Sequence, residues 1–113
     1  MPVTLAQILQ IQSALYGAVR AALTSLNEET LAQGLRLAEW PVERAGCLYT
    51  LAITLERGGR EIGECRFTID WRGDTYFDAD DEVLARCQPS DVETALRTFI
   101  DRRATPVAAR NAA

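Results

Sequence analysis

The fold of this chain is decided by residues 47–71, CLYTLAITLERGGREIGECRFTIDW. On both sides of the glycine pair, apolar residues alternate with polar ones, which is the period-two pattern of a half-buried β-strand. This pattern predicts strands over residues 47–57 and 61–71, joined by a hairpin at Gly58-Gly59. The predicted core face comprises Cys47, Tyr49, Leu51, Ile53 and Leu55 of the first strand and Cys65, Phe67, Ile69 and Trp71 of the second.

The length of the hairpin turn decides whether both strands present their apolar residues to one side. A two-residue loop at Gly58-Gly59 would place odd positions opposite even ones and turn one apolar face away from the core. A three-residue loop from Arg57 to Gly59 pairs Leu51 with Cys65 and keeps the faces together. A bulge near Ile62-Gly63 after a tight turn has the same effect. We prefer the three-residue loop and keep the bulge as the alternative.

A long amphipathic helix is predicted before the hairpin, over residues 5–26. Thr4 and Gln7 form a capping box, in which each side chain satisfies a backbone amide at the start of the helix. Apolar residues then recur at spacings of three and four, as in a heptad seam, with Gln12 as the one polar member. The seam consists of Leu5, Ile8, Gln12, Leu15, Val19, Ala22 and Leu26, and it is widened by Leu9, Tyr16 and Leu23.

The opposite face of this helix carries almost no charge, because Arg20 is the only charged residue between positions 4 and 26. A helix face that meets water usually carries charges, so either the domain or a second copy of the chain covers this one. A chain of 113 residues is short for surrounding a helix of about 33 Å. We predict a homodimer through residues 5–26, with Gln12 fixing the register. The predicted self-association residues are Ser13, Gly17, Arg20 and Ala21.

The remaining segments complete an α+β domain. We predict a second helix from Asn27, its N-cap, to Trp40, where Pro41 disfavours further helical geometry. The later elements are a third strand over Thr75–Asp78, a short helix over residues 81–87 that follows Asp80, and a final helix over residues 91–103 whose capping box is Ser90 and Glu93.

The expected fold is therefore two N-terminal helices, a three-stranded antiparallel β-meander, a short helix and a C-terminal helix, with the helices packed on one sheet face. The sequence contains no internal repeat and no linker that would divide it. We expect a single domain over residues 1–103 and a disordered C-terminal tail over residues 104–113.

Composition excludes several chemistries. The chain is 48% hydrophobic and 25% charged, as in ordinary globular domains. It has no histidine, and its 12 basic residues are all arginine, so catalysis by histidine or by a lysine Schiff base is excluded. Cys47, Cys65 and Cys87 lie too far apart in sequence for a metal-binding pair, and we interpret them as buried apolar residues. We predict no catalytic centre, metal or cofactor, and a cytoplasmic protein without a membrane segment.

Negative charge is concentrated in residues 74–82, which hold five carboxylates and no base in a chain of net charge −4. An acidic chain repels phosphate backbones, so we expect no nucleic-acid partner. The window does not match a calcium-binding EF-hand loop, because Val83 stands where glycine is required. It is either a solvated turn or a docking surface for a basic protein. The candidate partner-binding residues are Asp74, Asp78, Asp80, Asp81 and Glu82.

These features favour a small acidic protein that binds another protein: an adaptor, an inhibitor, an immunity-type neutraliser or a secretion chaperone. The chain is similar in general form to the class I secretion chaperones, which share its size, acidity and predicted dimerisation and lack the two leading helices. Trp40, which we expect in the core, could alternatively be a surface anchor. Two other functions are considered: a small enzyme or ligand sensor using carboxylate, tyrosine and arginine groups, and an oligomeric structural component.

Overall fold

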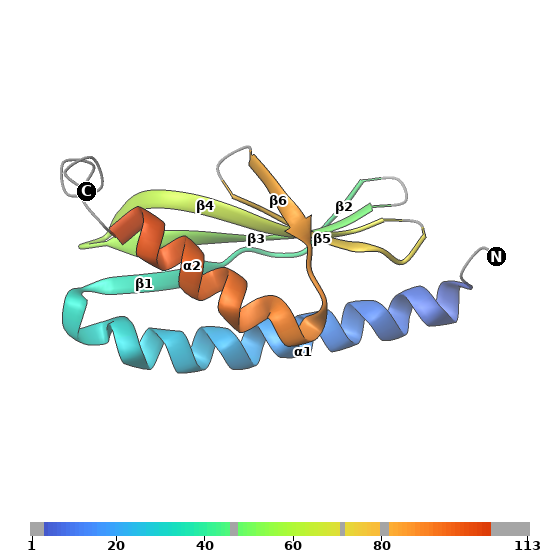
Figure 1. Cartoon of the computed structure of the whole chain (residues 1–113), viewed down its shortest axis with the longest axis horizontal. Helices are drawn as coiled ribbons and strands as arrows, with labels where there is room; N and C mark the ends of the chain where they lie inside the picture. Colours follow the sequence, from blue (N-terminus) through green and yellow to red (C-terminus); the bar gives the residue numbers. More distant parts are fainter. Residues whose placement is uncertain (1–3, 46–47, 71, 80–81, 105–113) are drawn as a thin grey trace.

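The computed structural model describes residues 4–45, 48–70, 72–79 and 82–104. They form an α+β structure in which a long N-terminal helix and a C-terminal helix lie along an antiparallel sheet (Figure 1). The elements are α1 (Leu5–Thr30), a 3-10 turn (Leu31–Gln33), β1 (Leu35–Glu39), β2 (Glu43–Ala45), β3 (Leu48–Arg57), β4 (Arg60–Ile69), β5 (Thr75–Ala79), β6 (Glu82–Arg86), a second 3-10 turn (Pro89–Asp91) and α2 (Val92–Ala104).

Helix α1 has 26 residues and runs from Leu5 to Thr30, whereas the first of the two predicted helices was expected to end at residue 26. Its start confirms the predicted capping box: the Gln7 amide donates to Thr4 Oγ1 at 3.1 Å, and the Thr4 amide donates to Gln7 Oε1 at 2.7 Å. The helix continues through Asn27, which was predicted to be the N-cap of a second helix. Instead, its Nδ2 donates to the Leu37 carbonyl, and its Oδ1 accepts the Leu37 amide.

The predicted second helix is wrong, because residues 35–39 form the strand β1. Gly34 separates the two elements in a left-handed conformation, at a φ of 72°, which glycine adopts without steric cost and which commonly ends a helix. Leu35 and Leu37 are buried and Arg36 between them is exposed, as the period of a strand requires. Leu31 and Leu35 have the four-residue spacing of a helix face, but they lie on opposite sides of this break.

The sheet has the strand order β1-β3-β4-β5-β6, and β2 pairs with β3 beyond the end of β1. All pairings are antiparallel, and the described residues make six strands where three were predicted. The predicted third strand is confirmed as β5. The short helix predicted over residues 81–87 is wrong, since residues 82–86 pair with β5 as β6. Its apolar run, Val83 to Ala85, is too short for periodicity to separate a helix from a strand.

The β3–β4 turn has two residues, so the preferred three-residue loop is wrong. Arg57 pairs with Arg60, and Gly58 and Gly59 occupy the turn with φ angles of 59° and 79°. Positive φ at both central positions is the requirement of the tight turn that matches the twist of a hairpin.

The alternative, a bulge near Ile62-Gly63, is confirmed. Leu55 lies opposite Gly63 while Glu56 lies opposite Glu61, which leaves Ile62 as the extra residue. The bulge restores the phase, so that Leu51 pairs with Phe67 on the core face instead of with Cys65.

The same bulge brings the backbone of β4 close to α2. A Cβ at Gly63 would lie 2.9 Å from Arg103 Cγ and 3.1 Å from Phe99 Cζ, so only glycine fits there without a shift of these two side chains. The predicted C-terminal helix is thus present and packs on the core face of the sheet. Its start differs from the prediction, because a 3-10 turn (Pro89–Asp91) precedes α2, and the capping box is formed at this turn by Gln88 and Asp91 in place of Ser90 and Glu93. Helix α2 ends at Ala104, and the rest of the predicted tail lies outside the described residues.

The core lies between the two helices and the sheet. Its largest fully buried side chains come from all of these elements: Phe67, Leu26, Ile53, Leu55, Leu96, Val19, Val92 and Cys65. The opposite face of the sheet carries polar residues of β3 and β4, such as Thr50, Glu64 and Thr68, and no described helix covers it. Two surfaces therefore remain without cover from the described chain: this open sheet face and the outer side of α1.

Candidate functional site

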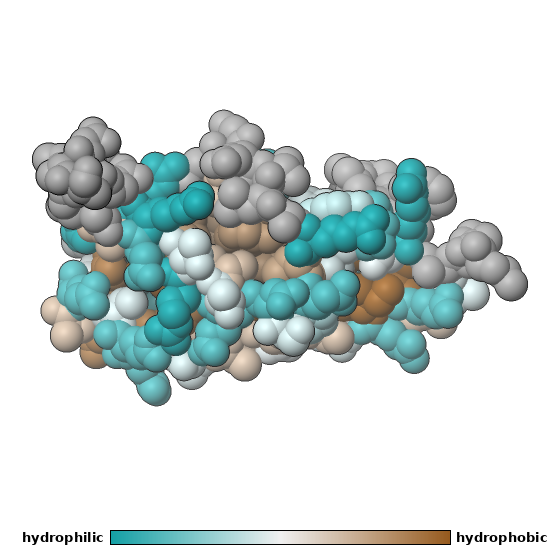
Figure 2. Space-filling view, viewed as in Figure 1, coloured by the Kyte–Doolittle hydropathy of each residue, from teal (hydrophilic) through white to brown (hydrophobic). Residues whose placement is uncertain are grey.

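The two halves of α1 differ in burial although the apolar pattern runs through both. In the C-terminal half, Leu15, Val19 and Leu26 are buried in the core. In the N-terminal half, Leu5 is 67% exposed and Leu9 is 48% exposed. Figure 2 shows hydrophobic surface over this part of α1, in the right half of the view. The heptad seam thus packs on the chain's own sheet over its later turns, and its first turns are left largely uncovered by the described residues.

A continuous row of residues spaced four apart runs along the outer side of α1. We name it the α1 ridge, and it consists of Leu5, Leu9, Ser13, Gly17 and Ala21, all of them exposed. Residues at this spacing stack into a ridge of the kind that packs between the side chains of another helix. The structure therefore brings three of the four predicted self-association residues, Ser13, Gly17 and Ala21, into one uncharged row.

Arg20, the fourth predicted residue, is held by contacts within the chain. Its Nη2 donates to the Tyr16 hydroxyl at 3.3 Å, and its guanidinium lies 5.0 Å from the centre of the Tyr16 ring. Its Nε lies 3.9 Å from Glu39 Oε2 of β1. The hydrogen bond and charge of Tyr16, followed by the charge of Glu39, raise the pKa of Arg20. The one charged side chain of this stretch is therefore engaged with Tyr16 and Glu39, beside the α1 ridge.

Gly17 has no role in the described fold of the single chain. A Cβ at this position would meet no atom within 4 Å, and the residue is not among the glycines with positive φ. Glycine inside a helix costs about 0.5–1 kcal/mol relative to alanine. The described residues therefore do not require a glycine here, and its surface is open to the close approach of another backbone.

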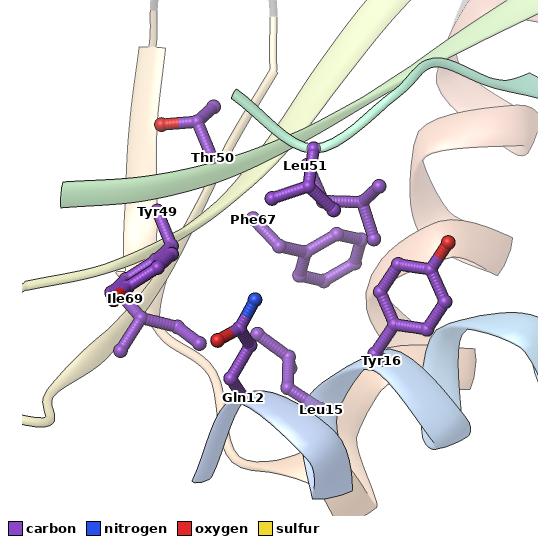
Figure 3. A pocket seen from close by; sticks show the side chains of 9 residues that line it. Gln12, Leu15, Tyr16, Tyr49, Thr50, Leu51, Phe67 and Ile69 are labelled. Carbon is purple, nitrogen blue, oxygen red and sulfur yellow. The ribbon is translucent and has the colours of Figure 1, made fainter. Parts of the chain in front are cut away.

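Gln12 faces the chain's own sheet, so it is not placed to fix the register of a partner helix as predicted. Figure 3 shows its side chain pointing from α1 toward a small cavity under β3 and β4. The cavity has a volume of about 20 Å³, which is room for roughly one water molecule. Its lining residues are Gln12, Leu15, Tyr16, Val42, Tyr49, Thr50, Leu51, Phe67 and Ile69.

Trp40 lies on the open face of the sheet, and the expectation that it packs in the core is wrong. Its side chain is 52% exposed. The Trp40 amide donates to the Ala52 carbonyl at 3.0 Å, and the indole Nε1 donates to Thr54 Oγ1 at 3.2 Å. These two bonds hold the ring over Thr54, which is buried. The sequence signal that could have located Trp40 is its place directly before Pro41, at the end of a strand.

A groove of about 370 Å³ adjoins the indole ring. We name it the Trp40 groove, and its lining residues are Trp40, Pro41, Val42, Glu43, Ala52, Thr54, Glu61 and Glu64. Val42 also borders a shallow depression on α1 next to Leu9 and Gly17. The Trp40 groove and the α1 ridge are therefore neighbouring surfaces that meet at Val42.

The predicted acidic window is divided among strands and partly neutralised. Asp78 Oδ1 lies 3.7 Å from Arg66 Nε of β4, and Asp74 Oδ2 lies 3.8 Å from Arg86 Nη2 of β6. Both described carboxylates thus have an arginine from a neighbouring strand beside them, which a sequence window cannot show. Glu82 is the first residue of β6, and Asp80 and Asp81 lie outside the described residues.

Cys65 and Cys87 are free and buried, as predicted, and Cys47 lies outside the described residues. Burial, followed by the charge of Asp91, raises the pKa of the Cys87 thiol to about 11, so this thiol stays protonated at neutral pH. Within residues 4–45, 48–70, 72–79 and 82–104, no three potential ligands are grouped to hold a metal ion. No helix in the same part of the chain is long and apolar enough to cross a membrane.

Comparison with known proteins gives no match to a family model, a curated protein or a solved structure. A functional proposal therefore starts from the two uncovered surfaces, the α1 ridge and the Trp40 groove.

Proposed function

We propose that the chain is a small protein-binding protein without a catalytic centre, of the adaptor, inhibitor, immunity-type or secretion-chaperone kind, and that it works as a homodimer formed by α1. The observation that carries this proposal is the α1 ridge, whose leucines at positions 5 and 9 are 67% and 48% exposed on a helix side without charge. Apolar area in water costs about 25 cal/mol per Å², so a partner that covers the ridge gains stability from it.

The α1 ridge has the shape to pack against a copy of itself. Its first part has large side chains, Leu5 and Leu9, and its second part has small ones, Ser13, Gly17 and Ala21. When two copies cross in antiparallel orientation about a two-fold axis at Ser13, Leu9 lies on Gly17 of the other copy and Leu5 lies on Ala21. Each large side chain of one copy then packs on a small residue of the other copy, as a self-complementary interface requires. This pairing supplies the reason for a glycine at position 17.

The described residues have one leading helix, α1, so the feature that set the chain apart from class I secretion chaperones is absent from them. The two helices expected from the sequence had separated this chain from that class. The likeness is one of general form and consists of small size, acidity and the dimerisation that we propose.

The proposal is tested by sedimentation of the wild type and of Gly17→Arg at high micromolar concentration. We expect a dimer for the wild type and a folded monomer for Gly17→Arg. The variant keeps its fold because the space around Gly17 is open, but it would bury an unpaired charge between two copies. Glu28→Arg, which places an arginine at another exposed position of α1, is the matched control and stays dimeric. A monomeric wild type contradicts the proposal.

The orientation of the pair is tested by disulfide cross-linking with Cys47→Ser in every variant. Ser13→Cys is expected to link to itself, because equivalent residues meet at the two-fold axis. Ala21→Cys is expected to link in a mixture with Leu5→Cys and not with itself. If Ala21→Cys links to a second Ala21→Cys chain and not to Leu5→Cys, the pair is parallel and the antiparallel arrangement is overturned.

A further inference from the structure

The floor of the Trp40 groove is apolar and fixed in place. It contains Trp40, which is 52% exposed, and Val42, which is 37% exposed, together with Pro41 and Ala52. The hydrogen bonds of the Trp40 amide and indole to Ala52 and Thr54 hold the ring in one orientation. A rigid, exposed aromatic surface loses little conformational freedom when a ligand stacks on it, which favours binding.

The rim of the groove carries one sign of charge. Glu43, Glu61 and Glu64 line it, and no basic residue is among the described side chains that line it. Glu64 is shared with Arg66, whose Nε lies 3.7 Å from Glu64 Oε1. Glu43 and Glu61 are exposed, and neither has an ion pair with another described residue.

Strand register adds to the negative field at this end of the sheet. Glu61 lies directly opposite Glu56, so two like charges stand side by side on the open face. Like charges in this position are unfavourable, and a cation placed beside them relieves the repulsion. The register puts Arg36 opposite Glu56 on the β1 side, and it gives Glu61 no basic residue opposite.

We propose that the Trp40 groove binds an arginine side chain of a basic protein partner. Arginine fits both parts of the site, because its planar guanidinium stacks on an indole ring and donates paired hydrogen bonds to carboxylates. The net charge of −4 also attracts a basic partner from solution. The inference rests on the proposed function because it names the chemistry of the bound protein, and it moves the partner site from the acidic window at residues 74–82 to the open sheet face.

The test uses Trp71→Phe, which leaves Trp40 as the single tryptophan of the two in the chain and makes its fluorescence a direct reporter of the groove. The probe is a short peptide of alternating arginine and alanine. We expect a saturable change in Trp40 fluorescence as the peptide is added, and weaker binding of the same peptide made with lysine.

Two double variants distinguish the contribution of the groove to peptide binding from the contribution of the net charge. Glu43→Gln with Glu61→Gln removes two rim charges, and we expect it to weaken peptide binding about tenfold. Glu28→Gln with Glu93→Gln removes two charges from exposed positions on α1 and α2, and we expect it to change binding less than about twofold.

Two results would overturn the inference: no change in Trp40 fluorescence, or equal weakening by both variant pairs, which would mean attraction by net charge alone. These results are distinguishable from a failure of the proposed dimer. The dimer is measured by sedimentation of the wild type without peptide, and Gly17 is not among the residues that line the Trp40 groove.

Discussion

The two halves of α1 share one amphipathic pattern but have different surroundings. Leu26 near the end of the helix is 1% exposed, whereas Leu5 at its start is 67% exposed. Periodicity shows that a helix face needs cover, and it does not show which molecule provides it. In the C-terminal half the cover is the chain's own sheet. In the N-terminal half we propose that it is a second copy of the chain.

The C-terminal half is also attached to the sheet by hydrogen bonds at the outer edge of β1. The side chain of Asn27 bonds both backbone groups of Leu37. The Thr30 hydroxyl shares its single proton between the Leu26 carbonyl of α1 at 2.9 Å and the Leu35 carbonyl of β1 at 3.2 Å. Side chains thus occupy groups that an edge strand would otherwise offer to another strand. The N-terminal half has its capping box and no comparable attachment to the sheet among the described residues.

The largest expected effect comes from a matched pair of leucine truncations, one in each half of α1. Leu26→Ala creates a cavity in the core and is expected to lower the free energy of unfolding by about 2–5 kcal/mol. Leu9→Ala is expected to lower it by less than about 1 kcal/mol in the Gly17→Arg monomer, because its side chain is half-exposed. Urea denaturation measures both values, and equal losses would show that the halves are covered alike.

A smaller effect is expected at the attachment to β1. Asn27→Ala removes the donor and the acceptor for Leu37, and we expect a loss of about 1–3 kcal/mol in the free energy of unfolding. Ser25→Ala, at an exposed position of the same helix, serves as the control and stays within about 0.5 kcal/mol of the wild type. An Asn27→Ala protein as stable as this control would show that water replaces both bonds without cost.

The smallest effect is expected at the ion pair that joins α1 to α2. Arg97 donates to the two carboxylate oxygens of Glu29 at 2.7 and 3.2 Å, and the hydrogen bond lowers the pKa of Glu29 from its ordinary value of 4.5. The folded state favours the charged carboxylate, so this stabilisation is present above the ordinary pKa and is lost as the pH falls through the lowered one. We expect Glu29→Gln to melt slightly below the wild type at neutral pH, with the gap closing in acid. A gap independent of pH would contradict this role.

The sequence correctly predicted the elements that are defined by interactions between residues close together in the chain. The Thr4–Gln7 capping box and the helical spacing located the start and inner face of α1. The alternation in residues 47–71 located β3 and β4, and the phase of their apolar faces required either a three-residue loop or a bulge. The apolar pattern could not choose between these two, because both align the faces. In the structure the positive φ angles of Gly58 and Gly59 form the two-residue turn, and Gly63 at the bulge lies against α2.

The elements that were predicted wrongly depend on contacts between distant residues. Asn27 was interpreted as a cap, and its partner is Leu37, ten residues later in another element. Gly34 was a local signal for the end of α1 that the interpretation missed. Strand β6 is defined by pairing with β5 and not by its own periodicity. Likewise, the arginines beside Asp74 and Asp78 come from neighbouring strands, so the sequence exaggerated the acidity of that region.

The separation of α1 and α2 in the chain has a consequence for synthesis on the ribosome. Arg97 follows its partner Glu29 by 68 residues, and translation adds roughly 5–20 residues per second. Helix α1 therefore emerges about 3–14 s before the helix that closes the core beside it. During this interval the stripe from Leu15 to Leu26 has only the cover of the sheet and lacks the cover of α2. A chain that stalls before residues 92–104 would lack Val92, Leu96 and Phe99, so its core would stay incomplete on the α2 side.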